Sequence, residues 1–307
     1  MIATVVTEPM ATLERAPTVQ ALDRPTHLAA RGVTFAYPDG TVALRSLDLT
    51  IPRGRKVVVL GANGCGKSTL FLHFGGVLRP KSGEIVLDGE TVRYDRAGLT
   101  RLRQKVGLVF QDPDSQLFAS SVRQDVSFGP LNLGWTEAKV REAVASAIEA
   151  TQITDLADRP AHLLSYGQKK RVAIAGVLAM DPELIVADEP TAGLDPEATA
   201  RLVELFDGLN ANGRTIVIST HDVELALAWA DEVIVMRAGE VIRTGHPTVV
   251  FQDVAMLRAA RLQQPIVLET YAHLCHMGLM PVDAAPPRNA SELADLINCN
   301  CTRIDLH

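Results

Sequence analysis

Residues 61–69 have the sequence GANGCGKST. This run fits the phosphate-binding pattern G-x-x-x-x-G-K-[ST], in which glycines let backbone N–H groups turn inward around a chain of phosphates. Lys67 would supply a positive charge for the β- and γ-phosphates, and the Ser68 hydroxyl is placed to bind Mg²⁺. The residues expected to bind nucleotide here are Gly61, Ala62, Asn63, Gly64, Cys65, Gly66, Lys67, Ser68 and Thr69.

The segments on either side of this loop support the same interpretation. KVVVLG, residues 56–61, is an apolar run typical of a parallel strand buried on both faces. STLFLHFGGVL, residues 68–78, predicts a helix whose N-terminal dipole favours anions. A glycine turn that carries a lysine by chance would not need this strand–loop–helix context.

A second motif is ELIVADEP, residues 183–190, in which an apolar strand ends at Asp188 and Glu189. We expect Asp188 to hold Mg²⁺ through water and Glu189 to polarise an attacking water as a general base. Adjacent carboxylates at the carboxyl end of a parallel strand lie where such sheets bind ligands. By itself the motif could be an acidic turn, but beside the phosphate-binding loop it favours a nucleotide site.

Three single residues gain meaning from these two motifs. Gln111 follows the strand VGLVF and His221 follows the strand TIVIS, so either side chain could reach the γ-phosphate or its water. Tyr37, in FAYPDG, could stack on an adenine. The alternatives are ordinary ones: solvated turn residues for Gln111 and His221, and a packing residue for Tyr37.

The wider pattern of strands and helices predicts an α/β fold around a parallel sheet. Period-two alternation in 31–40 and 44–54, with Leu47, Leu49 and Ile51 on one face, indicates antiparallel strands beside it. Two helices are expected, one capped by Thr136 and one capped by Asp195. A mostly helical insertion is expected from about residue 112 to residue 180.

Composition limits the remaining classes. The chain of 307 residues is 47% hydrophobic and 21% charged, with a net charge of −6, so it has no global attraction to nucleic acid. No apolar run reaches the roughly 18 residues that span a bilayer, and the N-terminus lacks a signal-peptide pattern. Four cysteines are too few for a secreted disulfide framework. These features favour the cytosol.

LLSYGQKKR, residues 163–171, has no acid–base pair and no metal-ligand spacing. Its position relative to the other motifs indicates its function. Tyr37, the loop 61–69, Gln111, LSYGQ, LIVADEP, GLD at 193–195 and His221 occur in the order found in ATP-binding cassette (ABC) ATPases, and this resemblance covers about residues 28–245. The resemblance implies a P-loop NTPase of ABC type, with a mixed β core, an antiparallel β subdomain and a helical signature subdomain.

The same resemblance implies roles for individual residues. Two chains would face each other head to tail, as a homodimer, with ATP between them. The residues expected to bind ATP in trans are Ser165, Gly167, Gln168 and Asp195; those expected to be catalytic are Glu189, His221 and Gln111; and those expected to hold Mg²⁺ are Ser68, Gln111 and Asp188. The three cations at 169–171 either add positive potential or solvate their helix, and solvation is expected for at least two of them.

Residues 107–134 and the tail GHPTVVFQDVAMLRAARLQQP are similar to ATPases of energy-coupling factor (ECF) importers, particularly the cobalt-import type. This implies an integral-membrane scaffold and substrate-binding subunits, on the cytoplasmic face of the membrane, and cobalt or nickel as cargo. Another importer, for example for a vitamin, remains an alternative, as does a soluble ABC ATPase that acts on DNA or ribosomes. The chain lacks the coiled coil, second cassette and basic groove that the soluble ATPases usually carry.

The ECF resemblance also implies a groove for arginine-bearing arms of the scaffold. Its acidic residues would be Asp112, Asp114 and Asp125, and its apolar floor Leu117, Phe118, Val122 and Phe128. Acids on a wet helix face over a normal core fit the same residue types, so the residues alone do not separate the two.

Three domains are expected: a flexible tail at 1–27, the ATP-binding domain at 28–245, and a small mostly helical appendage at 246–307 that the resemblance makes a dimerisation element. The appendage contains His273, Cys275, His276, Cys299, Cys301 and His307. A metal site is one interpretation of these side chains. Small structural cysteines with surface histidines are the favoured one, since the spacing matches no established zinc pattern.

Overall fold

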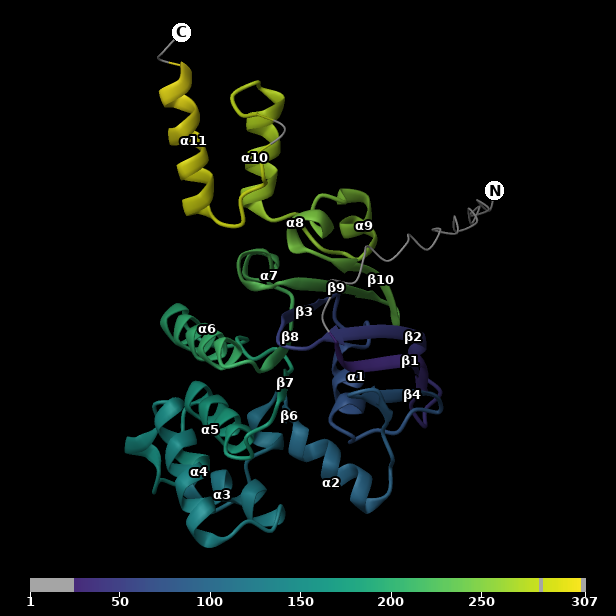
Figure 1. The fold of residues 1–307 in the computed structure, drawn as a ribbon, viewed down its shortest axis with the longest axis vertical. Helices are drawn as coiled ribbons and strands as arrows, with labels where there is room; N and C mark the ends of the chain where they lie inside the picture. Colours follow the sequence, from purple (N-terminus) through teal and green to yellow (C-terminus); the bar gives the residue numbers. More distant parts are fainter. Residues whose placement is uncertain (1–24, 282–283, 305–307) are drawn as a thin grey trace, which may run out of the picture.

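The computed structural model describes residues 25–281 and 284–304, without the side chains of 300–304 (Figure 1). The predicted flexible tail therefore lies almost entirely outside the described residues. Its boundary at residue 27 is wrong, because strand β1 (Thr26–Ala36) already includes Thr26 and His27. His27 is completely buried, so the chain is ordered by packing before the predicted start of the domain.

The nucleotide-binding half of the molecule is built on a six-stranded sheet with the order β10-β9-β3-β8-β7-β6. All neighbouring strands in it are parallel except the β9–β10 pair. The strands are β3 (Lys56–Leu60), β6 (Val106–Val109), β7 (Leu184–Ala187), β8 (Thr215–Thr220), β9 (Glu232–Arg237) and β10 (Glu240–Gly245). Strands β3, β6, β7 and β8 correspond to the apolar runs predicted from the sequence.

A four-stranded antiparallel sheet, with the order β2-β1-β4-β5, lies beside the parallel sheet. It contains β1, β2 (Val42–Pro52), β4 (Ser82–Leu87) and β5 (Glu90–Thr91). The predicted face formed by Leu47, Leu49 and Ile51 is buried. This confirms the antiparallel pair expected from the period-two pattern.

Three of the helices are grouped together in space (Figure 1). α3, α4 and α5 lie together at one end of the molecule, within the predicted insertion, and we call these helices, with the segment 112–121 that leads into α3, the helical arm. The cap of α4 by Thr136 and the cap of α6 by Asp195 are both present. The helices from the phosphate-binding loop to the helical arm are α1 (Lys67–Phe74), α2 (Arg96–Lys105), α3 (Val122–Asn132), α4 (Glu137–Ala150) and α5 (Tyr166–Leu178). Those that follow are α6 (Pro196–Ala211), α7 (Val223–Trp229), α8 (Pro247–Val250), α9 (Val254–Ala259), α10 (Ile266–His276) and α11 (Ala290–Ile304).

Both faces of the parallel sheet are covered, which explains why its central strands are apolar except at their ends. In β3, Val57 and Val59 pack into the core shared with the antiparallel sheet and α1. Val58 and Leu60, which point the other way, pack into the core shared with α5 and α6. The alternation holds the strand end at Leu60, and so the start of the phosphate-binding loop, between two packed layers.

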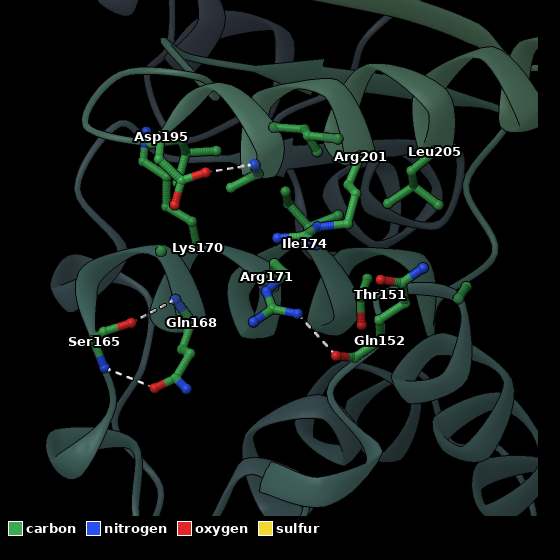
Figure 2. A pocket seen from close by; sticks show the side chains of 15 residues that line it. Thr151, Gln152, Ser165, Gln168, Lys170, Arg171, Ile174, Asp195, Arg201 and Leu205 are labelled. Atoms are coloured by element: carbon green, nitrogen blue, oxygen red, sulfur yellow. Dashed lines mark hydrogen bonds between the residues drawn. The ribbon is translucent and has the colours of Figure 1, made fainter.

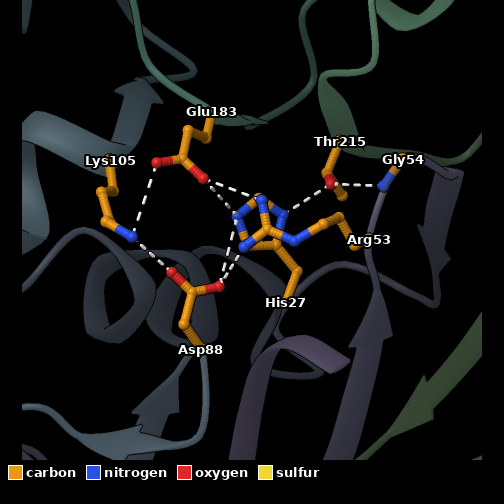
Figure 3. A network of polar contacts seen from close by, with 7 residues as sticks. All are labelled: His27, Arg53, Gly54, Asp88, Lys105, Glu183 and Thr215. Atoms are coloured by element: carbon orange, nitrogen blue, oxygen red, sulfur yellow. Dashed lines mark hydrogen bonds and ion pairs between the residues drawn. The ribbon is translucent and has the colours of Figure 1, made fainter. Parts of the chain in front are cut away.

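A polar network joins the two sheets where β3 and β8 begin (Figure 3). The buried His27 ring places Nδ1 2.6 Å from the Thr215 hydroxyl. Its Nε2 lies 3.8 Å from a Glu183 oxygen. Arg53 and Lys105 pair with the carboxylates around it. The parallel strands run away from this network, so it lies at the end of the sheet opposite the phosphate-binding loop.

The C-terminal appendage has its own small core. Tyr271, Met280 and Leu293 form its buried centre, between α10 and α11. Arg288 ties it to the end of α7 by donating from Nε to the Leu227 carbonyl at 2.9 Å. None of the helices in the described part of the chain has both the length and the hydropathy of a membrane-spanning segment.

The cysteines and histidines of this appendage do not gather in the described residues. Cys299 is exposed and Cys275 is half-buried. Among the residues that the structure describes, the one group of histidine, cysteine and acidic side chains close enough to share a metal is His27 with Asp88 and Glu183. Arg53 and Lys105 already neutralise those carboxylates. His307 lies outside the described residues, and nothing is described of the Cys301 side chain.

Candidate functional site

The phosphate-binding loop connects the end of β3 to the start of α1, as predicted. Its backbone takes turns that only glycine tolerates. A Cβ on Gly66, which has φ of 108°, would lie 2.6 Å from the Ala43 carbonyl oxygen, and one on Gly61 would lie 2.4 Å from the Met236 carbonyl oxygen. These glycines therefore let the loop lie against the neighbouring strands and fix its shape.

Of the two polar residues that begin α1, one is buried and the other is exposed. Lys67 is buried, and its ammonium donates a hydrogen bond to the Gly61 carbonyl oxygen at 2.7 Å, so it folds back across the loop. Ser68 is exposed. The N-terminal turn of α1 thus presents backbone N–H groups beside a positive charge, an arrangement that suits a phosphate chain.

Cys65 faces the interior rather than the loop surface. Its side chain is 6% exposed and packs in the core beneath Gly61. Burial raises the pKa of the thiol. Cys65 can therefore contribute to a phosphate site through its backbone but not through its side chain.

Tyr37 has a packing function in the structure. Its ring meets the Phe35 ring edge-on, with 5.2 Å between the centroids. Its hydroxyl lies 3.0 Å from the Thr69 hydroxyl, which connects the antiparallel sheet to α1. Stacking on an adenine remains a prediction for this residue.

Asp188 and Glu189 follow β7 and are both buried. The hydroxyl of Ser219, at the end of the neighbouring strand β8, connects them. It donates to Asp188 Oδ1 at 2.5 Å and accepts the backbone N–H of Glu189 at 2.8 Å. Ser219 is not among the residues predicted from the sequence; its one signal is a polar residue at the carboxyl end of an otherwise apolar strand, which proves to be adjacent to β7.

His221 and Glu189 lie close together, as their positions at the ends of neighbouring strands predict. His221 Nδ1 is 3.1 Å from Glu189 Oε2. The histidine side chain is 72% exposed and the glutamate side chain is 8% exposed. An exposed imidazole that contacts a buried carboxylate can also contact a group on the solvent side of the site.

Gln111 follows β6 and is exposed. Its backbone carbonyl accepts a hydrogen bond from the Tyr166 hydroxyl at 3.3 Å. This contact connects the residue to the first residue of α5. No hydrogen bond between described residues holds its side chain at Ser68 or Asp188, so a part in binding Mg²⁺ stays a prediction.

The signature turn, residues 164–168, forms a capping box at the N-terminus of α5 (Figure 2). The Ser165 backbone N–H donates to the Gln168 side-chain oxygen at 2.9 Å. The Gln168 backbone N–H donates to the Ser165 hydroxyl at 3.3 Å. The turn is therefore a rigid, exposed end of a helix that carries donors and no acid or base, as the sequence indicated.

A cavity of about 200 Å³ lies beside the signature turn, between α5 and α6 (Figure 2). Asp195 lines its edge and caps α6 by accepting a hydrogen bond from the Ala198 backbone at 2.7 Å. Ile174 and Leu202 are among the apolar residues of its wall. Ser165, Gln168 and Asp195 thus share one face of the chain.

The expectation that at least two of the three cations at 169–171 only solvate α5 is wrong. Lys169 pairs with Asp114 at 2.6 Å. Arg171 donates to the Gln152 carbonyl at 2.8 Å. Lys170 is 3% exposed and points into the molecule. The charged residues at 169–171 suggest a solvated helix face. In the structure this face is covered by the 3₁₀ turn 113–115 and by the segments that follow α4 and β7.

The predicted acidic groove needs two corrections. Asp125 is buried and accepts the backbone N–H groups of Phe118 and Ala119, both at 3.0 Å, so it fixes a turn and is not a surface charge. Val122 is completely buried in the core and is not part of an apolar floor. The side chains in the first turn of α3 contact the turn that precedes the helix, and residue type alone does not reveal such a contact.

Other members of the proposed groove do reach the surface. Phe118 and Phe128 are 64% and 49% exposed, and their rings meet edge-on with 4.6 Å between the centroids. Asp112 and Asp114 are exposed on the adjoining turn, and Leu117 is half-buried against the core. The helical arm thus presents an exposed aromatic pair beside exposed carboxylates.

Together, these features define a class of protein. A phosphate-binding loop, a carboxylate pair at the end of a parallel strand, a histidine that contacts it and a capped donor turn on a helical arm make up an ABC-type ATPase. The model of the ABC transporter family matches residues 44–192. The chain belongs to the ABC transporter ATPases, which bind and hydrolyse ATP.

Two similar proteins within this family are named as ATP-binding subunits of importers or energy-coupling factor transporters. The chain is 49% identical to the cobalt import ATP-binding protein CbiO of Rhodobacter capsulatus over 267 residues, covering 87% of this chain and 95% of that protein. It is 50% identical to the energy-coupling factor transporter ATP-binding protein EcfA of Methanocaldococcus jannaschii over 240 residues, covering 78% and 85%.

Solved structures that resemble this chain are also ATP-binding cassettes. CbiO1 of Clostridium perfringens, described as part of the ABC transporter complex CbiONQ, has 44% identity and a TM-score of 0.68, with 82% of this chain and all of that chain covered. A dimeric ATP-binding cassette in a post-hydrolysis state with ADP and Pi has 28% identity and a TM-score of 0.67, covering 72% and 98%.

Proposed function

We propose that this chain is the ATP-hydrolysing subunit of an ECF-type importer, working as a homodimer against an integral-membrane scaffold and substrate-binding subunits. The observation that carries the transport assignment is the exposed pair of Phe118 and Phe128 beside Asp112 and Asp114 on the helical arm. Exposed aromatic residues rimmed by charge are typical of a protein-binding surface.

In the proposed reaction, the phosphate-binding loop and Lys67 hold the phosphates. The oxygen ligands offered by Ser68, Gln111 and Asp188 suit Mg²⁺, which takes carboxylate, hydroxyl and water oxygens. The Asp188 carboxylate fits this assignment because the Ser219 hydroxyl already fixes one of its oxygens. When bound, Mg²⁺ would neutralise charge on the transferring phosphoryl group.

Glu189 is assigned to orient and deprotonate the attacking water, and His221 to contact the γ-phosphate. Glu189 is held on the inner side by its N–H bond to Ser219 and meets His221 on the outer side. This leaves its carboxylate at the boundary between core and surface, where a water can approach. Phosphoryl transfer depends mainly on such positioning and charge stabilisation.

Ser165, Gly167, Gln168 and Asp195 are assigned to the ATP of the partner subunit. Their common exposed face and lack of catalytic groups support this assignment. The dimeric form of the similar cassette gives it a precedent. Binding of ATP would then close the dimer and hydrolysis would reopen it, with the C-terminal appendage as a second contact between the subunits.

The cargo is assigned from the relatives. CbiO of Rhodobacter capsulatus is named a cobalt import protein, so cobalt is proposed first, with nickel or a vitamin as alternatives. An ATPase subunit of this kind does not contact the cargo. It would lie on the cytoplasmic face of the membrane, held there by its membrane partners.

The test is affinity purification of the tagged chain from detergent-solubilised membranes of the native cell, followed by identification of what co-purifies. A scaffold with a substrate-binding membrane protein is expected. Phe128→Asp should abolish this recovery, whereas Val42→Asp, which places the same charge at a residue 41% exposed on β2, should not. Recovery of the parent chain only from the soluble fraction would contradict the importer and favour a non-transport ATPase.

A further inference from the structure

Lys170, on the signature helix α5, reaches across the molecule to the backbone of the carboxylate motif. Its Nζ donates to the carbonyl oxygen of Glu189 at 2.6 Å and to that of Pro190 at 3.2 Å. The ammonium also lies 5.3 Å from the centre of the Tyr166 ring. Through Lys170, α5 therefore holds the segment that contains the proposed base.

This contact costs more than a neutral one would. A buried ammonium loses its hydration, and burial lowers the pKa of Lys170 to about 8, although the carboxylates of Glu189 and Asp188 act in the opposite direction. Two carbonyl acceptors and an aromatic face replace the lost water. An apolar side chain would fill this space without that cost, so packing alone does not account for a lysine.

The backbone that Lys170 holds is strained. Glu189 has φ of 46°, in the left-handed region that residues with a side chain rarely adopt. Its N–H is fixed by Ser219 on β8 and its carbonyl by Lys170 on α5. The conformation of Glu189 is thus determined jointly by the parallel sheet and by the helical arm.

We propose that Lys170 is a positioning residue that couples the two ATP sites of the dimer, by transmitting the engagement of the signature turn with the partner's nucleotide to Glu189 of its own subunit. The inference rests on the proposed contact in trans. Ser165 caps the N-terminus of α5, and Lys170 lies little more than one helical turn later. A shift of the helix N-terminus toward a phosphate therefore moves the donor to the Glu189 carbonyl, and each site becomes competent when the other is filled.

The test compares Lys170→Gln with the parent chain in steady-state ATP hydrolysis. We expect kcat to fall about ten-fold or more, as for the loss of a charged hydrogen bond, with KM within about two-fold. The Hill coefficient for ATP should fall from above one to one. Lys170→Arg, which keeps a cation with several donors, should restore cooperativity.

Lys56→Gln is the matched control. Like Lys170, Lys56 has a hydrogen-bonded ammonium near an aromatic ring: it pairs with Asp207 at 2.9 Å and lies 5.2 Å from the centre of the Trp229 ring. Unlike Lys170, it lies at the far end of the sheet. It should change thermal stability without changing the Hill coefficient. An unchanged kcat and Hill coefficient in Lys170→Gln would overturn the coupling and leave the proposed function standing.

A parent chain without cooperativity would overturn the coupling and also remove support from the contact in trans. If Lys170→Gln does not fold, hydrogen exchange in the parent chain gives the same test. The Ala192 N–H donates to the Glu189 carbonyl at 3.1 Å, so its exchange reports on that carbonyl. Mg-ATP should slow this exchange in the parent chain but not in Ser165→Asp; equal slowing in both would overturn the proposal.

Discussion

Lowering the pH from 7 to 5 should destabilise this protein through His27. The ring is 1% exposed, and it is enclosed by Thr215, Glu183 and Asp88, with Arg53 at their side (Figure 3). Burial, with the Arg53 charge second, lowers the pKa of His27 from 6.5 to about 4. The hydrogen bond from Arg53 holds the pKa of Glu183 below its usual range, so that carboxylate stays ionised in this interval.

The sign follows from proton uptake. Between pH 6.5 and pH 4 the unfolded chain binds a proton at His27 and the folded chain does not, so stability falls as the pH falls. For pKa values of 6.5 and about 4, the linkage relation gives a loss of less than about 1 kcal/mol at pH 7 and about 2 kcal/mol at pH 5. The difference, about 2 kcal/mol, is attributable to one side chain.

The assay is urea unfolding at pH 7 and pH 5, in the parent chain and in His27→Gln. The glutamine variant should be less stable at pH 7 but should lose about 2 kcal/mol less on acidification. The buried His73 is present in both chains, so its contribution cancels in the comparison. An identical loss in both chains would refute the reasoning that His27 is buried in its neutral form.

Three further outcomes are expected. Ser219→Ala should cost about 2–3 kcal/mol in unfolding free energy and lower kcat more than ATP affinity, because a buried N–H of Glu189 and one oxygen of Asp188 lose their partner; kcat equal to that of the parent chain would exclude Ser219 from the site. Cys65 should react slowly with an alkylating reagent because it is buried beneath the loop and its pKa is raised, and Mg-ATP should slow it further by holding the loop in place over the thiol; equal rates with and without Mg-ATP would show that bound nucleotide does not restrain the loop. Gly66→Ala should abolish ATP binding, measured by equilibrium dialysis, since a Cβ would lie 2.6 Å from a backbone oxygen; retained affinity would show that the loop shape is not required.

Sequence patterns predicted those parts of the fold that depend on neighbours in the chain. The phosphate-binding loop, the apolar strand before Asp188 and the caps Thr136 and Asp195 follow from short runs of residues, and each lies where it was expected. The family resemblance supplied the order in which they occur. The two sheets and the helical arm follow from that order.

The errors concern contacts between distant segments. Lys170 is indistinguishable from its two cationic neighbours until α5 is placed against the turn after β7. Ser219 matters because β8 pairs with β7, and Asp125 is buried because its own turn folds over it. His27 lies just outside the predicted domain, because its burial depends on residues more than 50 positions away. One-dimensional patterns do not contain these pairings.

The central claim is that the signature turn of one chain completes the ATP site of another. The most direct test measures ATP retained by Glu189→Gln after rapid desalting from Mg-ATP, since only a closed pair of subunits traps nucleotide. We expect about one ATP per chain, none in Glu189→Gln with Ser165→Asp, and full retention with Ser165→Thr, because aspartate and threonine both preserve the cap but aspartate repels a phosphate. Retention that is indifferent to Ser165→Asp would contradict the account.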